Sequence, residues 1–151
     1  MWSVSPASPE DLIAIRSLLD SSGLPTSDLE TARPEFSVVR GDGRVVAAGA
    51  LQRFGSSALL RSVVVAADRR GSGLGRSVLD ELERRARAAR VSRLVLLTET
   101  AVKFFAGAGY RVIERSSAPQ DMQGSEEFRS LCPSSATCME KSLADSTSRT
   151  P

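Results

Sequence analysis

Arg69-Arg70-Gly71-Ser72-Gly73-Leu74-Gly75-Arg76 joins an apolar run, which ends in Val63-Val64-Val65, to a helical pattern that continues to about Arg90. Alternate glycines let the backbone approach an anion closely, and a helix start offers free N–H groups and a positive dipole end. Arg70 and Arg76 add charge that suits phosphate oxygens. A plain strand-to-helix turn needs only one glycine. The pattern therefore predicts a pyrophosphate-binding loop.

The segment before this loop has the pattern of three short strands. Residues 36–40, 44–54 and 58–66 are rich in apolar and β-branched residues, and glycine-containing turns at 41–43 and 55–57 separate them. We expect an antiparallel meander, with a bulge or a close backbone approach at Gly49. This context and the glycine spacing do not match the dinucleotide-binding fingerprint.

The segment after the loop predicts a helix to about Arg90 and a strand over 93–97. Together with the strand over 58–66, this helix and strand would form a β-α-β unit. A buried stripe is expected at Val78, Leu79, Leu82, Ala86 and Ala89. The opposite face carries acidic and basic residues four apart, which predicts a solvated, ion-paired surface with the pairs Asp80/Arg84, Glu81/Arg85 and Glu83/Arg87.

The remaining elements follow from the same signals. Residues 2–6 predict a first strand, Ser8 and Pro9 begin a helix that Gly23 ends, and 24–35 is a loop or a loosely formed helix. Thr100 is expected to cap a short helix that contains Phe104 and Phe105. A strand over 110–114, a loop or broken helix over 116–124, a short helix over 125–131 and a last strand over 136–141 complete the domain. We expect this domain to span residues 1–143, with a disordered tail over 144–151.

Composition narrows the chemistry. A chain of 151 residues with 41% hydrophobic and 25% charged residues is ordinary for one globular domain. It has no histidine, which excludes a Ser-His-Asp triad, a histidine-ligated zinc site and a histidine general base. It also has no asparagine, and its two cysteines cannot form a four-thiolate metal site. We therefore expect no metal, and chemistry that uses backbone amides, carboxylates, hydroxyls, arginines or a bound cofactor.

Charge and hydropathy bear on partners and location. A net charge of +2 argues against a nucleic-acid binder. No apolar run reaches the roughly 18–20 residues of a membrane span, and the first residues lack the pattern of a signal peptide. Together with the sparse cysteines, these features predict a cytoplasmic protein with no membrane partner.

Three features of the sequence resemble the GCN5-related N-acetyltransferase (GNAT) superfamily. They are the glycine loop, the Val-Val-Val strand before it and the segments that follow it. Arg70-Gly71-Ser72-Gly73-Leu74-Gly75 matches its Gln/Arg-x-x-Gly-x-Gly/Ala motif, and 101–110 is similar to its Ala-x-x-Phe-Tyr-x-x-x-Gly-Phe segment. Element order agrees over roughly residues 2–141. The resemblance implies an α/β (α+β) domain with a mixed, mostly antiparallel sheet flanked by helices, and a homodimer is a common assembly in the family.

The same resemblance implies acetyl-CoA as cosubstrate and direct attack of a neutral amine on its thioester. Backbone groups of Val63 and Val65 would bind the pantetheine arm, with Val65 as a catalytic oxyanion donor, and the amides of residues 71–76 would hold the pyrophosphate. The expected cofactor-binding residues are Val63, Val64, Val65, Arg70, Gly71, Ser72, Gly73, Leu74, Gly75, Arg76 and Phe104.

Two positions depart from the family pattern. The tyrosine that often protonates the coenzyme A thiolate is replaced by Phe105, so the sequence identifies no general acid. The family's frequent asparagine is also absent near 98–100. Glu99, at the carboxyl end of a strand, is the candidate catalytic base, directly or through water, although an exposed acid before a helix cap accounts for it equally well.

The closing segment suggests a substrate class. Leu131-Cys132-Pro133-Ser134-Ser135-Ala136-Thr137-Cys138-Met139 is similar to the ending of the arsenic-resistance N-acetyltransferase branch. That resemblance implies an amino-acid-like toxicant of the arsinothricin or phosphinothricin type as acceptor. Arg33, Arg53 and Arg61 are candidates by position for its anionic end, each alternatively an ordinary surface residue. Cys132 and Cys138 form either a soft thiolate pair for trivalent arsenic or two small half-buried hydrophobes, and the second alternative is favoured.

Other functions remain open at this level. The acceptor of the same chemistry is alternatively a polyamine, a protein N-terminus or an antibiotic amine. The missing tyrosine and asparagine also allow a non-catalytic acyl-CoA-binding or regulatory module.

Overall fold

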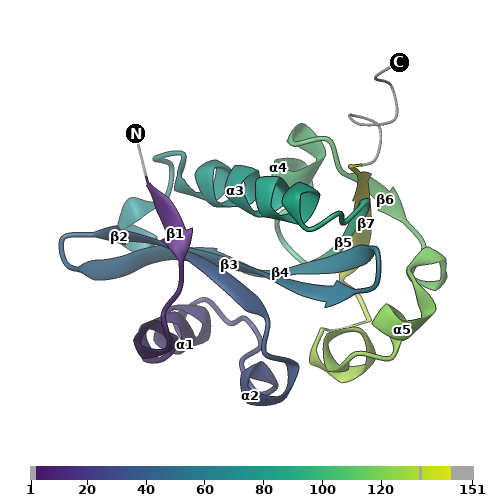
Figure 1. Cartoon of the computed structure of the whole chain (residues 1–151), viewed down its shortest axis with the longest axis horizontal. Helices are drawn as coiled ribbons and strands as arrows, with labels where there is room; N and C mark the ends of the chain where they lie inside the picture. Colours follow the sequence, from purple (N-terminus) through teal and green to yellow (C-terminus); the bar gives the residue numbers. More distant parts are fainter. Residues whose placement is uncertain (1–2, 133, 144–151) are drawn as a thin grey trace. The chain divides into compact units, whose positions relative to one another are not determined.

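A computed structural model of the chain describes residues 3–132 and 134–143. Seven strands form one mixed sheet in the order β1-β2-β3-β4-β5-β7-β6 (Figure 1). Pairing is antiparallel for β1–β2, β2–β3, β5–β7 and β6–β7, and parallel for β4–β5, which confirms the predicted fold class. The strands are β1 Val4–Pro6, β2 Glu35–Gly41, β3 Arg44–Phe54, β4 Ser57–Val65, β5 Arg93–Thr98, β6 Arg111–Ile113 and β7 Thr137–Ser142.

Backbone contacts divide the chain into two units. Unit 1 comprises residues up to 52 together with 60–85, and unit 2 comprises 53–59 and the residues from 86 onward. The α-helices are α1 Leu12–Ser21, α2 Leu29–Ala32, α3 Leu74–Ala88, α4 Val102–Gly107 and α5 Gln120–Gln123. The described 3-10 helices are η1 Pro9–Asp11, η2 Ala67–Arg69 and η3 Arg115–Ser117, and η4 Glu127–Leu131 is a π-helix. No described helix is both long and apolar enough to cross a membrane.

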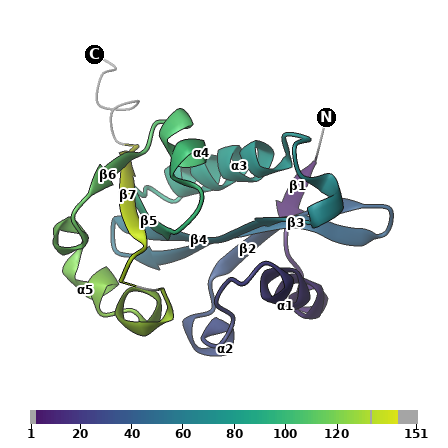
Figure 2. The same cartoon turned by 180° about the vertical axis from the view of Figure 1, so that it is seen from behind.

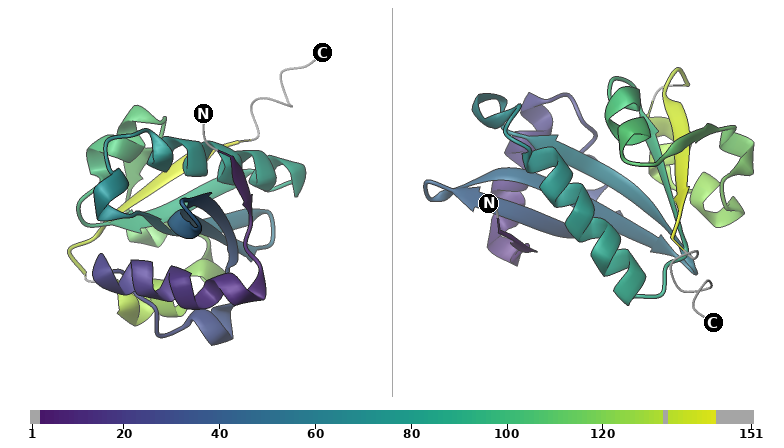
Figure 3. Two further views of the ribbon diagram at one scale, coloured as in Figure 1. Left: turned by 90° about the vertical axis from the view of Figure 1, so that its left-hand side faces the viewer. Right: turned by 90° about the horizontal axis from the view of Figure 1, so that it is seen from above.

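Helices cover both faces of the sheet in unit 1 (Figure 2). Ile15 and Leu19 of α1 pack with Val38, Ala48 and Val64 of the strands on one face. On the other face α3 comes so close to β3 that a Cβ atom at Gly49 would lie 2.8 Å from side-chain atoms of Val78 and Leu82. The close approach predicted at Gly49 is confirmed, and Figure 3 shows α3 running across these strands.

Local signals account for the entry into unit 1. The main-chain N–H of Ser8 donates to the Asp11 carboxylate over 2.7 Å, so the predicted N-cap is confirmed, although the first turn is the 3-10 helix η1. The predicted turn between β2 and β3 is also confirmed, since Asp42 and Gly43 have φ values of 54° and 76°, as tight hairpin turns require.

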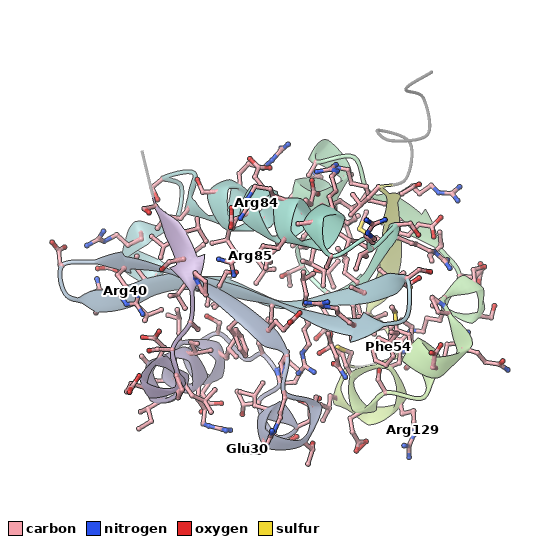
Figure 4. All side chains as sticks on the ribbon, in the orientation of Figure 1. Glu30, Arg40, Phe54, Arg84, Arg85 and Arg129 are labelled. Carbon is pink, nitrogen blue, oxygen red and sulfur yellow. The ribbon has the colours of Figure 1, made fainter. Side chains whose placement is uncertain are left out.

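The charged face of α3 pairs differently from the simple four-residue spacing. Glu81 accepts hydrogen bonds from both Arg84 and Arg85, and Asp80 pairs with the preceding Arg76. The predicted Asp80/Arg84 pair is therefore wrong, because Arg84 is taken by the acid three residues before it. In Figure 4, Arg84 points away from the sheet and Arg85 toward it, where Arg85 Nη1 donates to Ser37 Oγ over 2.5 Å.

The stripe on α3 agrees with the prediction at four of its five positions. Val78, Leu79, Leu82 and Ala86 are buried. Ala89 lies beyond the end of the helix and is half-buried.

Unit 2 is built on the parallel pairing of β4 with β5, which confirms the predicted β-α-β unit. Its core joins Leu59, Val95, Met122, Phe128 and Cys138, from both ends of the unit's sequence. Helix α4 begins after Ala101, whose N–H donates to Thr98 Oγ1 over 3.0 Å. The N-cap of this helix is thus Ala101, and the expectation that Thr100 caps it is wrong.

The last part of the described chain is anchored. Leu143 is buried, and its N–H donates to the carbonyl of Ser92 over 2.8 Å. The tail expected over 144–151 lies outside the described residues.

Candidate active site

The glycine loop in unit 1 lies between η2 and α3. Gly71 and Gly73 have φ values of 81° and 86°, a conformation that L side chains rarely adopt, and a Cβ atom on either would meet nothing within 4 Å. Glycine is therefore required here by the backbone and leaves open space beside it. The N–H groups of the first turn of α3 have no partners within the helix, which makes them donors for an anion.

The polar side chains around the loop have different hydrogen-bond and ion-pair partners. Arg70 Nε donates to the Val65 carbonyl over 3.2 Å, and its Nη2 lies 3.3 Å from Ser22 Oγ at the end of α1. Arg76 is exposed and pairs with Asp80 over 3.0 Å. Ser72 donates its hydroxyl to the Arg69 carbonyl, so its side chain closes the loop. Leu74 is buried, and only its main chain is available to a ligand.

The end of β4 adds a feature that the sequence pattern did not indicate. Ser62 has a φ of 60°, a left-handed residue inside a strand. The register of the β4–β5 pairing covers only Ser57, Ala58 and Leu59, before this kink. Beyond it, Val64 packs into the core with α1, whereas Val63 and Val65 are half-buried. No composition or periodicity signal marks a left-handed serine in an apolar strand.

Behind the kink lies a buried polar network of unit 1. Nη1 and Nη2 of Arg61 each donate to one oxygen of Asp28 over 2.7 Å, and Nη1 also donates to Gln52 Oε1 over 3.0 Å. The side chains of Arg61 and Asp28 are 0% and 4% exposed. Arg61 is therefore not at the surface, and Asp28 is a partner that local sequence reasoning missed.

The other two candidate arginines are exposed. Arg33 ends α2 in unit 1 with a φ of 46°, and Arg53 belongs to unit 2 near the end of β3. Arg33 thus shares a unit with the glycine loop and with the end of β4.

Unit 2 contains the remaining candidates. Glu99 is exposed after the end of β5, and Phe104 is 37% exposed on α4. Phe105, at the family's tyrosine position, is buried and packs edge-on against Tyr110 with ring centroids 5.6 Å apart. Burial raises the pKa of the Cys138 thiol to about 11, so this side chain is a neutral core residue.

The start of α3 fits the pyrophosphate of the coenzyme A thioester that the GNAT resemblance implies. Two left-handed glycines with open space beside them lead into a helix of 15 residues. Such a start accommodates a pyrophosphate through main-chain N–H groups and the helix dipole, without a basic side chain at each oxygen.

Comparison with known proteins gives an independent result. The family model described as "Acetyltransferase (GNAT) domain" matches residues 32–112, more than half of the chain. The N-acetylglutamate synthase from Neisseria gonorrhoeae, complexed with coenzyme A and N-acetyl-glutamate, superposes with a TM-score of 0.81 at 21% identity, over 95% of this chain. The present chain spans only 35% of that protein's length.

Two further structures match along most of their own length. Rv2747 from Mycobacterium tuberculosis, in complex with CoA and NLQ, has a TM-score of 0.80 at 27% identity, over 93% of this chain and 99% of that one. The ribosomal-protein-S18-alanine N-acetyltransferase from Escherichia coli has a TM-score of 0.72 at 19% identity, over 95% and 94%. The fold and the family model agree: the chain belongs to the GNAT acetyltransferase family.

Proposed function

We propose that this domain transfers the acetyl group of acetyl-CoA to the α-amine of a small amino-acid-like acceptor that carries an anionic arsenic or phosphorus group. The observation that carries the cofactor half of this proposal is the left-handed pair Gly71 and Gly73 at the start of α3. The acceptor half rests on the resemblance of residues 131–139 to the arsenic-resistance branch, and on an exposed arginine in unit 1.

The chain's own contribution to the chemistry is mainly from its main chain. The amides of residues 71–76 bind the pyrophosphate and hold the thioester near the end of β4. The Val65 N–H then donates to the thioester oxygen, where negative charge develops as the amine attacks, and a fixed donor at that atom stabilises the transition state more than the ground state. This role needs no histidine.

Proton handling follows from the residues that are missing. The attacking amine must be deprotonated, so we expect the rate to rise with pH as the acceptor amine loses its proton. Glu99 stays our candidate for the group that accepts this proton, directly or through water. With phenylalanine at position 105, the thiolate leaves without a tyrosine acid.

Arg33 is the arginine that we propose for the anionic end of the acceptor. It is exposed, whereas Arg61 is buried with its guanidinium held by Asp28. Its left-handed backbone also carries a conformational cost that glycine would avoid, and such costs gather at functional positions. A guanidinium binds tetrahedral oxygens by charge-assisted hydrogen bonds.

One of the similar proteins supports an amino-acid-like acceptor. The Neisseria gonorrhoeae synthase was crystallised with N-acetyl-glutamate in one case and with L-arginine in another. Arsinothricin and phosphinothricin are amino acids whose side chains end in an anionic arsenic or phosphorus group with tetrahedral oxygens. Both are therefore larger analogues of glutamate.

The experiment is a side-by-side assay of thiol release from acetyl-CoA with arsinothricin, phosphinothricin, spermidine and a peptide amine. We expect one of the two amino-acid analogues to be the best acceptor. Replacing Arg33 with alanine should raise the KM for this acceptor by about tenfold or more and change kcat little. A contact with the anionic end, remote from the amine, binds the ground state and the transition state alike. Arg53→Ala is the matched control.

Two outcomes of this assay contradict the proposal at different levels. If spermidine or the peptide is the best acceptor and both analogues are inert, the acceptor class is wrong. If no amine releases thiol although acetyl-CoA binds, the domain is an acyl-CoA-binding module.

A further inference from the structure

We propose that Asp28 and Arg61 are positioning residues, whose buried ion pair holds Ser62 in its left-handed conformation and thereby aims the main-chain N–H groups of Val63 and Val65. The role of those N–H groups rests on the proposed function above. The kink and the network that contacts it are properties of unit 1 alone.

The network is assembled from separate parts of the sequence. Asp28 precedes α2, Gln52 lies near the end of β3, and Arg61 is the residue directly before the kink in β4. Each Nη of Arg61 has a carboxylate oxygen at 2.7 Å. The planar guanidinium is thus held in two directions, by the fork of Asp28 and by Gln52, and cannot rotate freely.

The same guanidinium also contacts the kink itself. Arg61 Nε lies 3.4 Å from Ser62 Oγ. Successive side chains of a regular strand point to opposite faces, so this contact between neighbours depends on the left-handed turn at Ser62. Network and kink therefore favour each other.

Stability alone does not account well for such a pair. Burying two charges costs desolvation, and an apolar pair of similar volume often does as well or better. A left-handed serine adds a conformational cost and persists only when its surroundings determine it. Both costs occur in neighbouring residues, directly before the segment that the proposed function uses.

The consequence lies at the end of β4. A φ of 60° at Ser62 turns the following peptide groups away from the direction of a regular strand. The N–H groups of Val63 and Val65 are useful as donors only if they point consistently at one place, because a misplaced donor loses most of its effect on the transition state. The ion pair between Asp28 and Arg61 would keep these N–H groups pointing in one direction.

A simpler role for Asp28 is to tie α2 to the rest of unit 1. Glu30, an exposed acid of α2 that is labelled in Figure 4, provides the comparison, because it pairs with Arg16 of α1. If anchoring of α2 were all that mattered, removing Asp28 would lower stability and leave the backbone conformation of Ser62 unchanged.

The test combines Asp28→Asn and Ser62→Gly as single and double variants, with Glu30→Gln as control. Asp28→Asn should lower kcat by about tenfold or more while the KM for acetyl-CoA changes less than about threefold, the mark of an interaction used in the transition state. In the Ser62→Gly background the same replacement should cost less than about threefold, because glycine adopts the left-handed conformation without support. Glu30→Gln should behave as the wild type.

A second readout does not need turnover. Asp28→Asn should shift the NMR amide resonances of Val63 and Val65 and change the HN–Hα coupling of Ser62, which reports φ. An unchanged coupling in the folded variant would overturn the proposal, as would an equal loss of kcat in the Ser62 and glycine backgrounds. If Asp28→Asn does not fold, Arg61→Lys replaces it in the same scheme, since lysine keeps the charge and loses both the fork and the Nε–H. A wild type that acetylates no amine contradicts the proposed function only, and the NMR result still decides the positioning role.

Discussion

Arg70 and Val65 are joined by a hydrogen bond of 3.2 Å from the arginine Nε to the valine carbonyl. The bond spans the connection between β4 and α3, so one side chain ties the glycine loop to the strand end before it. Its second contact, to Ser22 Oγ, reaches the end of α1. The side chain of Arg70 therefore holds in place the loop that we propose for the pyrophosphate.

Replacing Arg70 with methionine should weaken acetyl-CoA binding by about tenfold or more, because a charge-assisted hydrogen bond contributes roughly 1.5–3 kcal/mol. Calorimetric titration with acetyl-CoA measures the change. Arg44→Met is the control, since Arg44 pairs with Asp68 on the exposed surface. Equal affinities for both variants would show that Arg70 is not part of the cofactor site.

Installing tyrosine at position 105 should change turnover less than tenfold, which corresponds to about 1.4 kcal/mol of barrier. Phe105 is buried against Tyr110, so the added hydroxyl enters a packed region and should mainly lower stability. The measurement is kcat with the best acceptor of the panel. A much larger gain would mean that protonation of the leaving thiolate limits the rate of the wild type.

Glu81 should make the stability of the protein sensitive to acid. Hydrogen bonds from Arg84 and Arg85 lower the pKa of Glu81 from 4.5 to about 2. A carboxyl whose pKa is lower in the folded state stabilises it above the unfolded pKa and loses this contribution as pH falls toward the folded one. Glu81→Gln should therefore be less stable than the wild type above about pH 5, and the difference should disappear near pH 2. Urea unfolding across this pH range checks the sign, and a difference that grows in acid would contradict it.

Cys138 should behave as a core residue and not as a thiolate ligand. Its burial raises the pKa to about 11, so almost no thiolate is present at neutral pH. We expect maleimide to label Cys138 only after unfolding, and the combination of Cys132→Ser with Cys138→Val to keep most of the acetyl-transfer activity. If that double variant folds but loses activity, the two cysteines take part in the active site.

Local signals in the sequence were sufficient for most of the fold. Turn glycines, the Ser8 cap and the apolar stripe of α3 act over a few residues. The glycine turn between β2 and β3 and the Ser8 cap are as predicted, and the stripe is as predicted at four of its five positions. The helix ion pairs were less predictable because Glu81 has basic neighbours both three and four residues away, and geometry chooses between them. Likewise Thr98 and Thr100 both precede α4, and only the fold determines which one reaches the helix start.

In the candidate site, too, features set by neighbouring residues could be predicted, and features set by residues distant in the sequence could not. The loop could be predicted from Gly71 and Gly73, since a plain turn from a strand into a helix needs only one glycine. The Asp28–Arg61 pair joins residues 33 positions apart, and no local pattern connects them. The kink at Ser62 is equally hidden, because a left-handed serine is set by its surroundings and not by its own preference.

In the proposed function the glycine loop holds the pyrophosphate of acetyl-CoA, and Gly73→Glu tests this role most directly. Gly43→Glu is its matched control, because Gly43 has a similar φ of 76°, against 86° at Gly73, and equal open space beside it, but lies in the β2–β3 turn. Both variants introduce the same strain and the same charge. In a calorimetric titration with acetyl-CoA, we predict that Gly43→Glu binds like the wild type and that Gly73→Glu shows no measurable binding. Equal binding by the two variants would contradict the role of the glycine loop in holding the pyrophosphate.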